Sequence, residues 1–140
     1  MILGIGVDQV EVARIERLLG KRPERGAERL FTPAERTVCG SRRRPAECYA
    51  ARFAAKEAFV KALGTGLREG MRWTEIEVRT HPDGRPEILL SGAAGRRFRE
   101  RGGRRIHLSF THEGGQAVAL VVLEGAPGTP EADDFEGAGS

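Results

Sequence analysis

The stretch Arg52-Phe-Ala-Ala-Lys-Glu-Ala-Phe-Val-Lys-Ala-Leu-Gly-Thr-Gly66 decides the fold, because it predicts the second half of a long helix. Its alanines favour the helix, and the first of its two glycines stands where a C-terminal cap belongs. A helix turns once in about 3.6 residues, so Glu57 and Lys61 share one face, with Arg52 and Lys56 as a second pair beside them. The ordinary interpretation is a solvated face with ion pairs that contribute about 0.2–0.5 kcal/mol each. The rest of the chain favours another interpretation, a carboxylate held among cations for chemistry.

The composition is that of one globular domain: 140 residues, 39% hydrophobic and 31% charged. We find no run long enough to span a membrane, and the apolar N-terminus lacks the basic start of a signal peptide. The sequence therefore predicts a cytoplasmic protein without a membrane partner. Cys39 and Cys48 lack the spacing of a metal site, so we expect two free thiols.

Charge is distributed unevenly along the chain, whose net charge is +3. Residues 125–140 hold four acidic side chains and no Lys or Arg, which leaves 23 basic against 16 acidic groups, or +7, over residues 1–124. We expect residues 1–124 to form the folded domain and residues 125–140 a disordered acidic tail. A basic body indicates an acidic partner, such as nucleic acid, a phosphorylated small molecule or an acidic protein.

Hydrophobic periodicity and turn signals predict an α+β fold in the order β-α-α-α-β-β-α-β-β. The sheet should be mainly antiparallel, because its last four strands form two hairpins, and it should pack against the long helix. The expected strands cover residues 2–8, 73–80, 86–90, 105–112 and 116–123, and the expected helices residues 11–19, 33–40, 46–63 and a short stretch after Ser91.

The first strand places Gly4, Gly6 and Asp8 on one face. Two glycines on one face of a strand indicate close approach by another backbone or by a ligand. The third glycine of a dinucleotide-binding motif is missing and no βαβ unit follows, so we exclude that kind of site. Asp8 thus stands at the end of a strand, on the same face as the two glycines.

Asp8 and Glu57 together predict a magnesium site. Mg²⁺ is usually held by one or two carboxylates, with phosphate oxygens and water completing its coordination. Phosphoryl transfer also needs cations, which Lys61, Arg52 and the glycine turn at residues 64–66 provide. The sequence contains neither a P-loop motif nor HExxH, which excludes a P-loop enzyme and argues against a zinc site.

Three motifs of the chain occur together. The first is Gly4-Ile-Gly-Val-Asp8 followed by Val10-Glu-Val-Ala-Arg-Ile15, the second is the whole stretch of residues 52–66, and the third is the strand that ends in Ser109-Phe-Thr-His112. These motifs resemble those of the holo-[acyl-carrier-protein] synthase family of 4′-phosphopantetheinyl transferases. The resemblance covers about residues 1–124 in order and spacing, and the second motif is the most specific.

The resemblance implies a reaction of fatty acid biosynthesis. Coenzyme A would donate its 4′-phosphopantetheine arm to a serine of apo-acyl carrier protein and release adenosine 3′,5′-bisphosphate. Asp8 and Glu57 would hold Mg²⁺, and Lys61 would stabilise charge on the phosphate oxygens. The serine proton would pass either to Glu57 or to a metal-bound water, and both alternatives stay open.

The resemblance further implies a homotrimer with sites shared between adjacent subunits. Residues of this chain expected to bind coenzyme A are Arg44, Arg52, Lys61, Gly64, Gly66, Pro86 and His112. His81 and His107 are expected to be structural.

The carrier protein is small and acidic, which fits a basic surface along the helix of residues 11–19 and the loop after it. The residues expected to bind it are Arg14, Arg17, Leu18, Lys21, Arg22 and Arg25. Exposed ion pairs contribute only about 0.2–1 kcal/mol each, so they would steer association while apolar contacts add affinity.

Two other classes of function compete with this interpretation. One is a small basic nucleic-acid-binding protein using Arg42–Arg44 and the arginines of residues 96–105, but no aromatic side chain is interleaved with them for base stacking. The other is a module that binds carrier proteins without catalysis, which would not need the carboxylates of Asp8 and Glu57. The sequence therefore favours the transferase, without a nucleic-acid partner.

Overall fold

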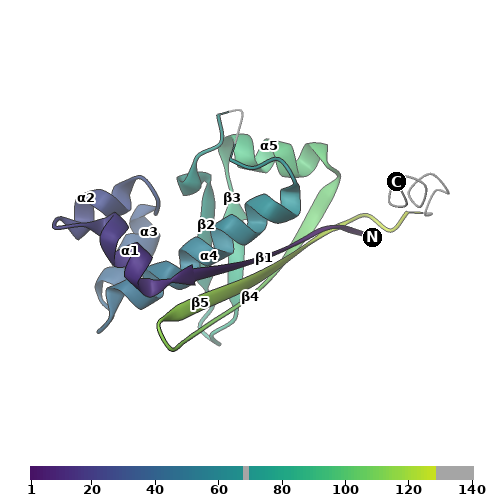
Figure 1. The fold of residues 1–140 in the computed structure, drawn as a ribbon. Helices are drawn as coiled ribbons and strands as arrows, with labels where there is room; N and C mark the ends of the chain where they lie inside the picture. The colour runs from purple at the N-terminus through teal and green to yellow at the C-terminus, as the bar shows by residue number, and fades with distance from the viewer. Residues whose placement is uncertain (68–69, 129–140) are drawn as a thin grey trace.

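The long helix α4, Pro45–Leu63, lies across one face of an antiparallel sheet in the computed structural model of the chain (Figure 1). The structure describes residues 1–67 and 70–128. Alanine occupies many positions of α4, so the helix approaches the sheet closely and is buried on nearly all sides. The α+β class and the packing of an antiparallel sheet against a long helix, both predicted from the sequence, are confirmed.

Ten helices and strands and one 3-10 turn make up the described part of the chain. The strands are β1 Ile2–Glu11, β2 Ile76–Thr80, β3 Pro86–Leu90, β4 Gly103–Glu113 and β5 Gln116–Gly125. Besides α4, the helices are α1 Val12–Leu19, α2 Pro23–Glu28, α3 Pro33–Gly40 and α5 Gly92–Glu100, and the 3-10 turn η1 is Trp73–Glu75.

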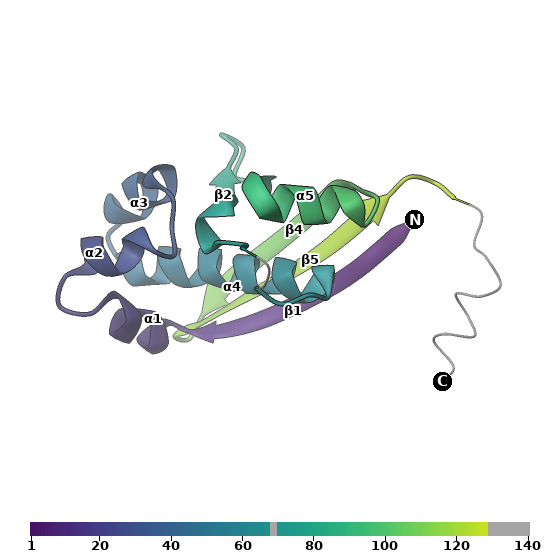
Figure 2. The same ribbon diagram turned by 90° about the horizontal axis from the view of Figure 1, so that it is seen from above.

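The strands form two antiparallel sheets. β5 lies between β1 and β4 in the larger sheet, and β2 pairs with β3 in the smaller one. Seen from above, α4 crosses the larger sheet, while α1, α2 and α3 gather at one end of the molecule (Figure 2). Both predicted hairpins are present, and the apolar β5 is the central strand.

Two predictions about secondary structure were wrong in detail. The loop expected after α1 contains the short helix α2, which begins at a proline; three of its six residues are charged and it contains no large apolar side chain besides the proline, so it shows no apolar stripe. The strand expected from Trp73 begins at Ile76. Glu75 ends the preceding 3-10 turn instead, because its side chain accepts hydrogen bonds from the backbone N–H groups of Arg72 (2.9 Å) and Ala93 (3.0 Å).

The glycines of β1 allow the backbone of α4 to lie directly against the strand. A Cβ atom added to Gly6 would overlap the carbonyl oxygen of Ala58, and one added to Gly4 would overlap that of Ala62. Of the two alternatives left open by the sequence, the close neighbour is therefore a backbone. This contact fixes the distance between Asp8, two residues further along β1, and the middle of α4.

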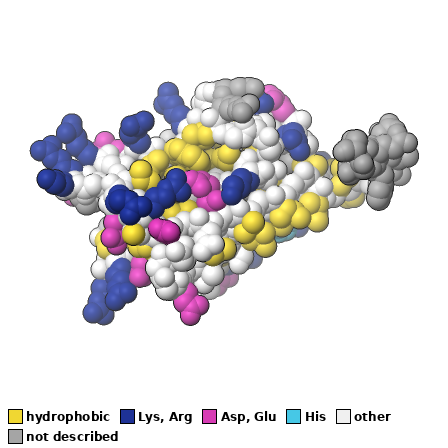
Figure 3. Space-filling view, in the orientation of Figure 1, with side chains coloured by type: hydrophobic (Ala, Val, Ile, Leu, Met, Phe, Trp, Pro, Cys, Tyr) yellow, Lys and Arg dark blue, Asp and Glu magenta, His cyan; other side chains and the backbone are white. Residues whose placement is uncertain are grey.

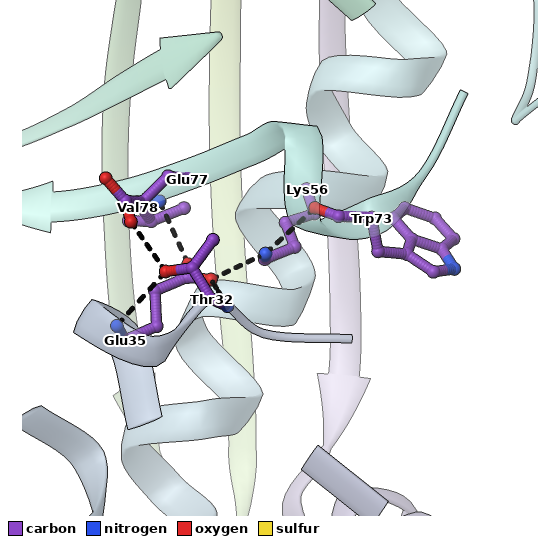
Figure 4. A network of polar contacts seen from close by, with 6 residues as sticks. All are labelled: Thr32, Glu35, Lys56, Trp73, Glu77 and Val78. Carbon is purple, nitrogen blue, oxygen red and sulfur yellow. Dashed lines mark hydrogen bonds and ion pairs between the residues drawn. The ribbon is translucent and has the colours of Figure 1, made fainter. Parts of the chain in front are cut away.

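A buried ion pair joins α3 to α4 (Figure 4). The sequence had placed Lys56 beside Glu57 on one surface, but Lys56 is fully buried. Its Nζ donates to Glu35 Oε1 (2.7 Å) and to the carbonyl of Trp73 (3.0 Å). Glu35 also accepts from the backbone N–H of Thr32, which completes the predicted capping box of α3, and from that of Val78. The network ties α3, α4, η1 and β2 together.

Lys56→Met should lower the free energy of unfolding by about 3–5 kcal/mol, because it leaves the carboxylate of Glu35 buried without its cation. The double variant Lys56→Met/Glu35→Gln should lose less, because no uncompensated charge stays buried. Urea denaturation measures both, and Lys21→Met, which removes an exposed charge, is the matched control. A double variant less stable than Lys56→Met would contradict this account of the pair.

The expectation of two free thiols was wrong. Cys39 at the end of α3 and Cys48 in the first turns of α4 form a disulfide, with their Cα atoms 5.3 Å apart. This pairing could not be predicted from cysteine spacing, because it depends on how the loop at residues 41–44 returns α4 alongside α3.

The face of the larger sheet opposite α4 carries exposed apolar side chains. Ile5 and Val7 on β1 are 60% and 56% exposed, and Leu120 on β5 is 44% exposed. Figure 3 shows hydrophobic side chains in a band along this edge of the molecule. Within the described residues, no helix is both long and apolar enough to cross a membrane.

Candidate active site

The carboxylate of Asp8 lies where β1 passes over α4. Its side chain is only 8% exposed, and Lys61 Nζ donates to Asp8 Oδ1 at 2.7 Å and to the carbonyl of Val7 at 3.2 Å. The cation of α4 thus meets the acid of β1 across 53 residues of sequence. Lys61 pairs with Asp8 rather than with Glu57, its neighbour one turn earlier on the helix.

Glu57 lies beside this pair and is also held by a cation from α1. Arg14 Nη2 lies 3.5 Å from Glu57 Oε1, and the guanidinium stacks over the ring of Phe53, 5.6 Å from its centroid. Burial, followed by the closeness and the negative charge of the Asp8 carboxylate, raises the pKa of Glu57 to about 7, although Arg14 and Lys61 act in the opposite direction. Two carboxylates therefore share one small site.

The site is chemically suited to a divalent cation. Asp8 Oδ2 is buried and has no hydrogen-bond partner among residues 1–67 and 70–128. An unpaired carboxylate oxygen next to a second carboxylate of raised pKa is stabilised by a hard cation, and two carboxylates suffice for Mg²⁺ when phosphate and water supply the other ligands. A cage of three or more His, Cys, Asp or Glu side chains is absent from the described residues, which fits a metal shared with a phosphate.

A second region, which we call the arginine cavity, lies at the other end of α4. It has a volume of about 550 Å³, and its walls include Arg42, Arg43, Arg44, Cys48, Arg52 and His112. Three of the residues predicted to bind coenzyme A, Arg44, Arg52 and His112, thus come together. Arg42 and Arg43 were assigned to the competing nucleic-acid interpretation, and the run of arginines was the available signal.

Arg52 is the buried cation of this cavity. It is 4% exposed; its Nη1 donates to Cys48 Sγ at 3.2 Å and its Nη2 to Thr80 Oγ1 at 3.3 Å. Its Nε is buried without an acceptor in the described part of the chain. Because a guanidinium stays charged and an unpaired buried donor is costly, the cavity is prepared for an anion. Among the described residues that line it, Glu47 is the only acid, 3.3 Å from Arg44 and 3.8 Å from His112.

The carboxylate pair and the arginine cavity are separate regions of the chain, because neither Asp8 nor Glu57 lines the cavity. Gly64 and Gly66 lie beyond the C-terminal end of α4, both with positive φ, and Gly64 is its left-handed cap. Pro86 begins β3 and is not part of the cavity lining. Arg44, Arg52 and His112 therefore share the arginine cavity, whereas Lys61, Gly64, Gly66 and Pro86, the other predicted coenzyme A ligands, do not line it.

The basic residues predicted to bind the carrier protein lie on and after α1. Figure 3 shows Lys and Arg side chains gathered at this end of the molecule. The predicted inward stripe of Val12, Ile15 and Leu19 is buried, whereas Leu18 is 46% exposed on the outer surface. Arg14 differs from the others in this set, because it contacts Glu57 directly; its role beside the carboxylates could not be seen from helix periodicity alone.

Comparisons with known proteins agree with this arrangement. The 4′-phosphopantetheinyl transferase superfamily matches residues 4–121. The chain belongs to this superfamily. Two of its most similar curated relatives, holo-[acyl-carrier-protein] synthases of Trichlorobacter lovleyi and Anaeromyxobacter dehalogenans, are 55% and 54% identical over 89% and 90% of this chain, and each is covered to 98%. The predicted resemblance is confirmed, and the chain is an enzyme of the holo-[acyl-carrier-protein] synthase type.

Solved transferase structures share the fold of this family member. The enzyme of Neisseria meningitidis superposes with a TM-score of 0.81 at 39% identity, covering 89% of this chain and 99% of that one. The Helicobacter pylori enzyme, in complex with coenzyme A, has a TM-score of 0.75 at 30% identity and covers 86% and 99%. The matched span of this transferase, residues 4–121, includes both the carboxylate pair and the arginine cavity and ends before the predicted acidic tail. Most of that tail, residues 129–140, lies outside the described residues.

Proposed function

We propose that this chain transfers the 4′-phosphopantetheine group of coenzyme A to a serine of apo-acyl carrier protein in a Mg²⁺-dependent reaction. The observation that carries the proposal is the meeting of Asp8, Glu57 and Lys61 in one site on a chain of this family. The serine oxygen forms a bond to the phosphorus attached to pantetheine, the bond from that phosphorus to the leaving phosphate breaks, and adenosine 3′,5′-bisphosphate departs. The cytoplasm and fatty acid biosynthesis are the proposed setting.

The residues of the site have distinct roles in this proposal. Asp8 and Glu57 would hold Mg²⁺, which supplies positive charge at the pyrophosphate when it is bound. Lys61, whose side chain is 58% exposed beyond its contact with Asp8, is free to extend to a phosphate oxygen and to stabilise the charge that grows there. Arg14, whose Nη2 lies 3.5 Å from Glu57 Oε1, holds the Glu57 carboxylate in place.

The arginine cavity would receive the 3′-phosphate of coenzyme A, with Arg44, Arg52 and His112 as its cations. In a single chain this cavity is separate from the carboxylate pair, which favours a complete site formed between two subunits. The exposed apolar face with Ile5 and Val7 is suited to subunit contact. We therefore propose a homotrimer in which Pro86, Gly64 and Gly66 contact the nucleotide at the subunit boundary.

Mass spectrometry of apo-acyl carrier protein tests the proposed reaction. After incubation with this protein, coenzyme A and MgCl₂, the carrier should gain the mass of one phosphopantetheine group, and adenosine 3′,5′-bisphosphate should appear in equal amount. Replacing MgCl₂ by a chelator should stop both. An unmodified carrier, in the presence of each component, would contradict the proposed function.

Magnesium binding should weaken below pH 7. Because the pKa of Glu57 is raised to about 7, a proton competes with the ion for this carboxylate at lower pH. We expect the apparent affinity for Mg²⁺ to fall about tenfold for each pH unit below 7 and to be constant above about pH 8. Titration calorimetry with MgCl₂ from pH 5.5 to 8.5 measures this. Glu57→Gln should bind weakly at every pH, whereas an equally flat profile for the unmodified protein would be inconsistent with competition at Glu57.

Charge reversal on the basic surface should weaken use of the carrier protein. Arg17→Glu/Arg22→Glu is expected to raise the KM for apo-acyl carrier protein about tenfold, because two attractive contacts become repulsive, and to leave the KM for coenzyme A unchanged. Arg14 is excluded because it contacts Glu57. The control Arg96→Glu/Arg104→Glu has the same net charge change near α5 and β4. Equal effects of the two double variants would assign the loss to net charge alone.

A further inference from the structure

The disulfide closes a loop that carries three cations of the arginine cavity. Cys39 and Cys48 are nine residues apart, and Arg42, Arg43 and Arg44 lie between them. All three line the cavity. The loop thus holds like charges close to one another and to the buried Arg52, an arrangement that electrostatic repulsion opposes.

The disulfide also contacts the fourth cation directly. Arg52 Nη1 donates to Cys48 Sγ, while Thr80 holds the other terminal nitrogen. The side chain is 4% exposed and its Nε lacks an acceptor among residues 1–67 and 70–128. The sulfur of Cys48 therefore helps to fix the buried guanidinium of Arg52.

We propose that the Cys39–Cys48 disulfide is a positioning element of the arginine cavity, so that its reduction weakens the binding of the nucleotide 3′-phosphate. This inference rests on the proposed function. A crosslinked loop has fewer conformations, so less freedom is lost when Arg42–Arg44 converge on a phosphate. In the reduced protein the three arginines repel one another and move apart in the free state. Phosphate binding must then bring them back together, which lowers the affinity.

The chemistry needs only a dithiol reductant. Cys39 is fully buried, whereas Cys48 is partly exposed and lines the arginine cavity, so in this proposal the thiolate of the reductant attacks Cys48 Sγ. A mixed disulfide forms there, the original S–S bond breaks, and Cys39 leaves as a thiolate that takes up a proton. The second thiol of the reductant then displaces Cys48, which gives two protein thiols and one oxidised dithiol. Nucleotide binding would then depend on whether the surrounding thiol pool is oxidising enough to keep this disulfide closed.

Titration calorimetry with adenosine 3′,5′-bisphosphate tests the proposal. This ligand has no thiol, so it cannot react with the disulfide as coenzyme A could. Pretreatment with dithiothreitol should weaken its binding to the unmodified protein about tenfold. Adenosine 5′-monophosphate, which lacks the 3′-phosphate, should change by less than twofold, and this difference separates the cavity from general loosening of the fold.

The variant Cys39→Ala/Cys48→Ala should bind the bisphosphate weakly with or without dithiothreitol. If it does not fold, the comparison of the oxidised and reduced unmodified protein decides alone. Equal bisphosphate affinity in both states, while transfer to the carrier still proceeds, would overturn the positioning role and leave the proposed function intact. Tight bisphosphate binding by the reduced protein, its reduction verified by alkylation of both thiols, would overturn the positioning role as well. Absence of bisphosphate binding in either state, together with an unmodified carrier, would contradict the proposed function itself.

Discussion

Glu57→Gln and Asp8→Asn should each lower the rate of phosphopantetheine transfer at least about a thousandfold, a loss of roughly 4 kcal/mol of transition-state stabilisation. Each change keeps the shape of the side chain but removes one of two negative charges that would hold the divalent ion. Asp8→Asn also takes away the partner of Lys61, which lies 2.7 Å from it. Initial rates of holo-carrier formation at saturating coenzyme A measure the loss, and Glu100→Gln on α5 is the control for removal of an acid elsewhere.

The stability of these variants distinguishes a catalytic role from a structural one. In the folded protein the pKa of Glu57 is raised from 4.5 to about 7, so its contribution to stability declines as pH rises through this range. At pH 8 the ionised carboxylate destabilises the fold, and Gln removes that cost. Glu57→Gln should therefore unfold at the same or a higher urea concentration than the unmodified protein at pH 8. Loss of activity together with loss of stability would count against the proposed role.

The sequence predicted the faces of single elements well. The boundaries of the long helix were expected at residues 46–63 and lie at Pro45–Leu63. Asp8, Glu57 and Lys61 were expected together and lie together, because an alternating strand and a helix of regular pitch each determine which side chains share a face. The glycines on one face of β1 also indicated that another backbone or a ligand approaches this strand closely, and the structure shows that the backbone of α4 does so.

What the sequence could not show was which neighbour each face would meet. Lys56 and Glu57 are consecutive cation and acid, yet Lys56 turns inward to Glu35 while Glu57 stays near the surface beside Arg14. The partner in each case comes from a helix whose position depends on packing. The Cys39–Cys48 disulfide was missed for the same reason, since only the course of the loop between α3 and α4 brings the sulfurs together.

Gly6→Ala should cost more than about 3 kcal/mol of folding free energy and remove activity with it. The new methyl group would overlap the carbonyl oxygen of Ala58, a backbone atom inside α4 that cannot rotate away as a side chain could. Overpacking of cores typically costs 1–3 kcal/mol, and a clash with backbone lies at the upper end or beyond. Against a total stability of about 5–15 kcal/mol, this is a large fraction, and the urea midpoint should fall accordingly.

Gly40→Ala is the matched control, because a Cβ atom there meets no described atom within 4 Å and the residue ends a helix without positive φ. It should be neutral or stabilise by about 0.4–1 kcal/mol. Any Gly6→Ala protein that still folds must move β1 away from α4 and with it Asp8 away from Glu57. Since a displacement of about 1 Å can cost a hundredfold in rate, its transfer activity should fall further than its folded fraction. If Gly6→Ala were as stable and active as Gly40→Ala, the contact of β1 with α4 would not be what sets the carboxylate pair.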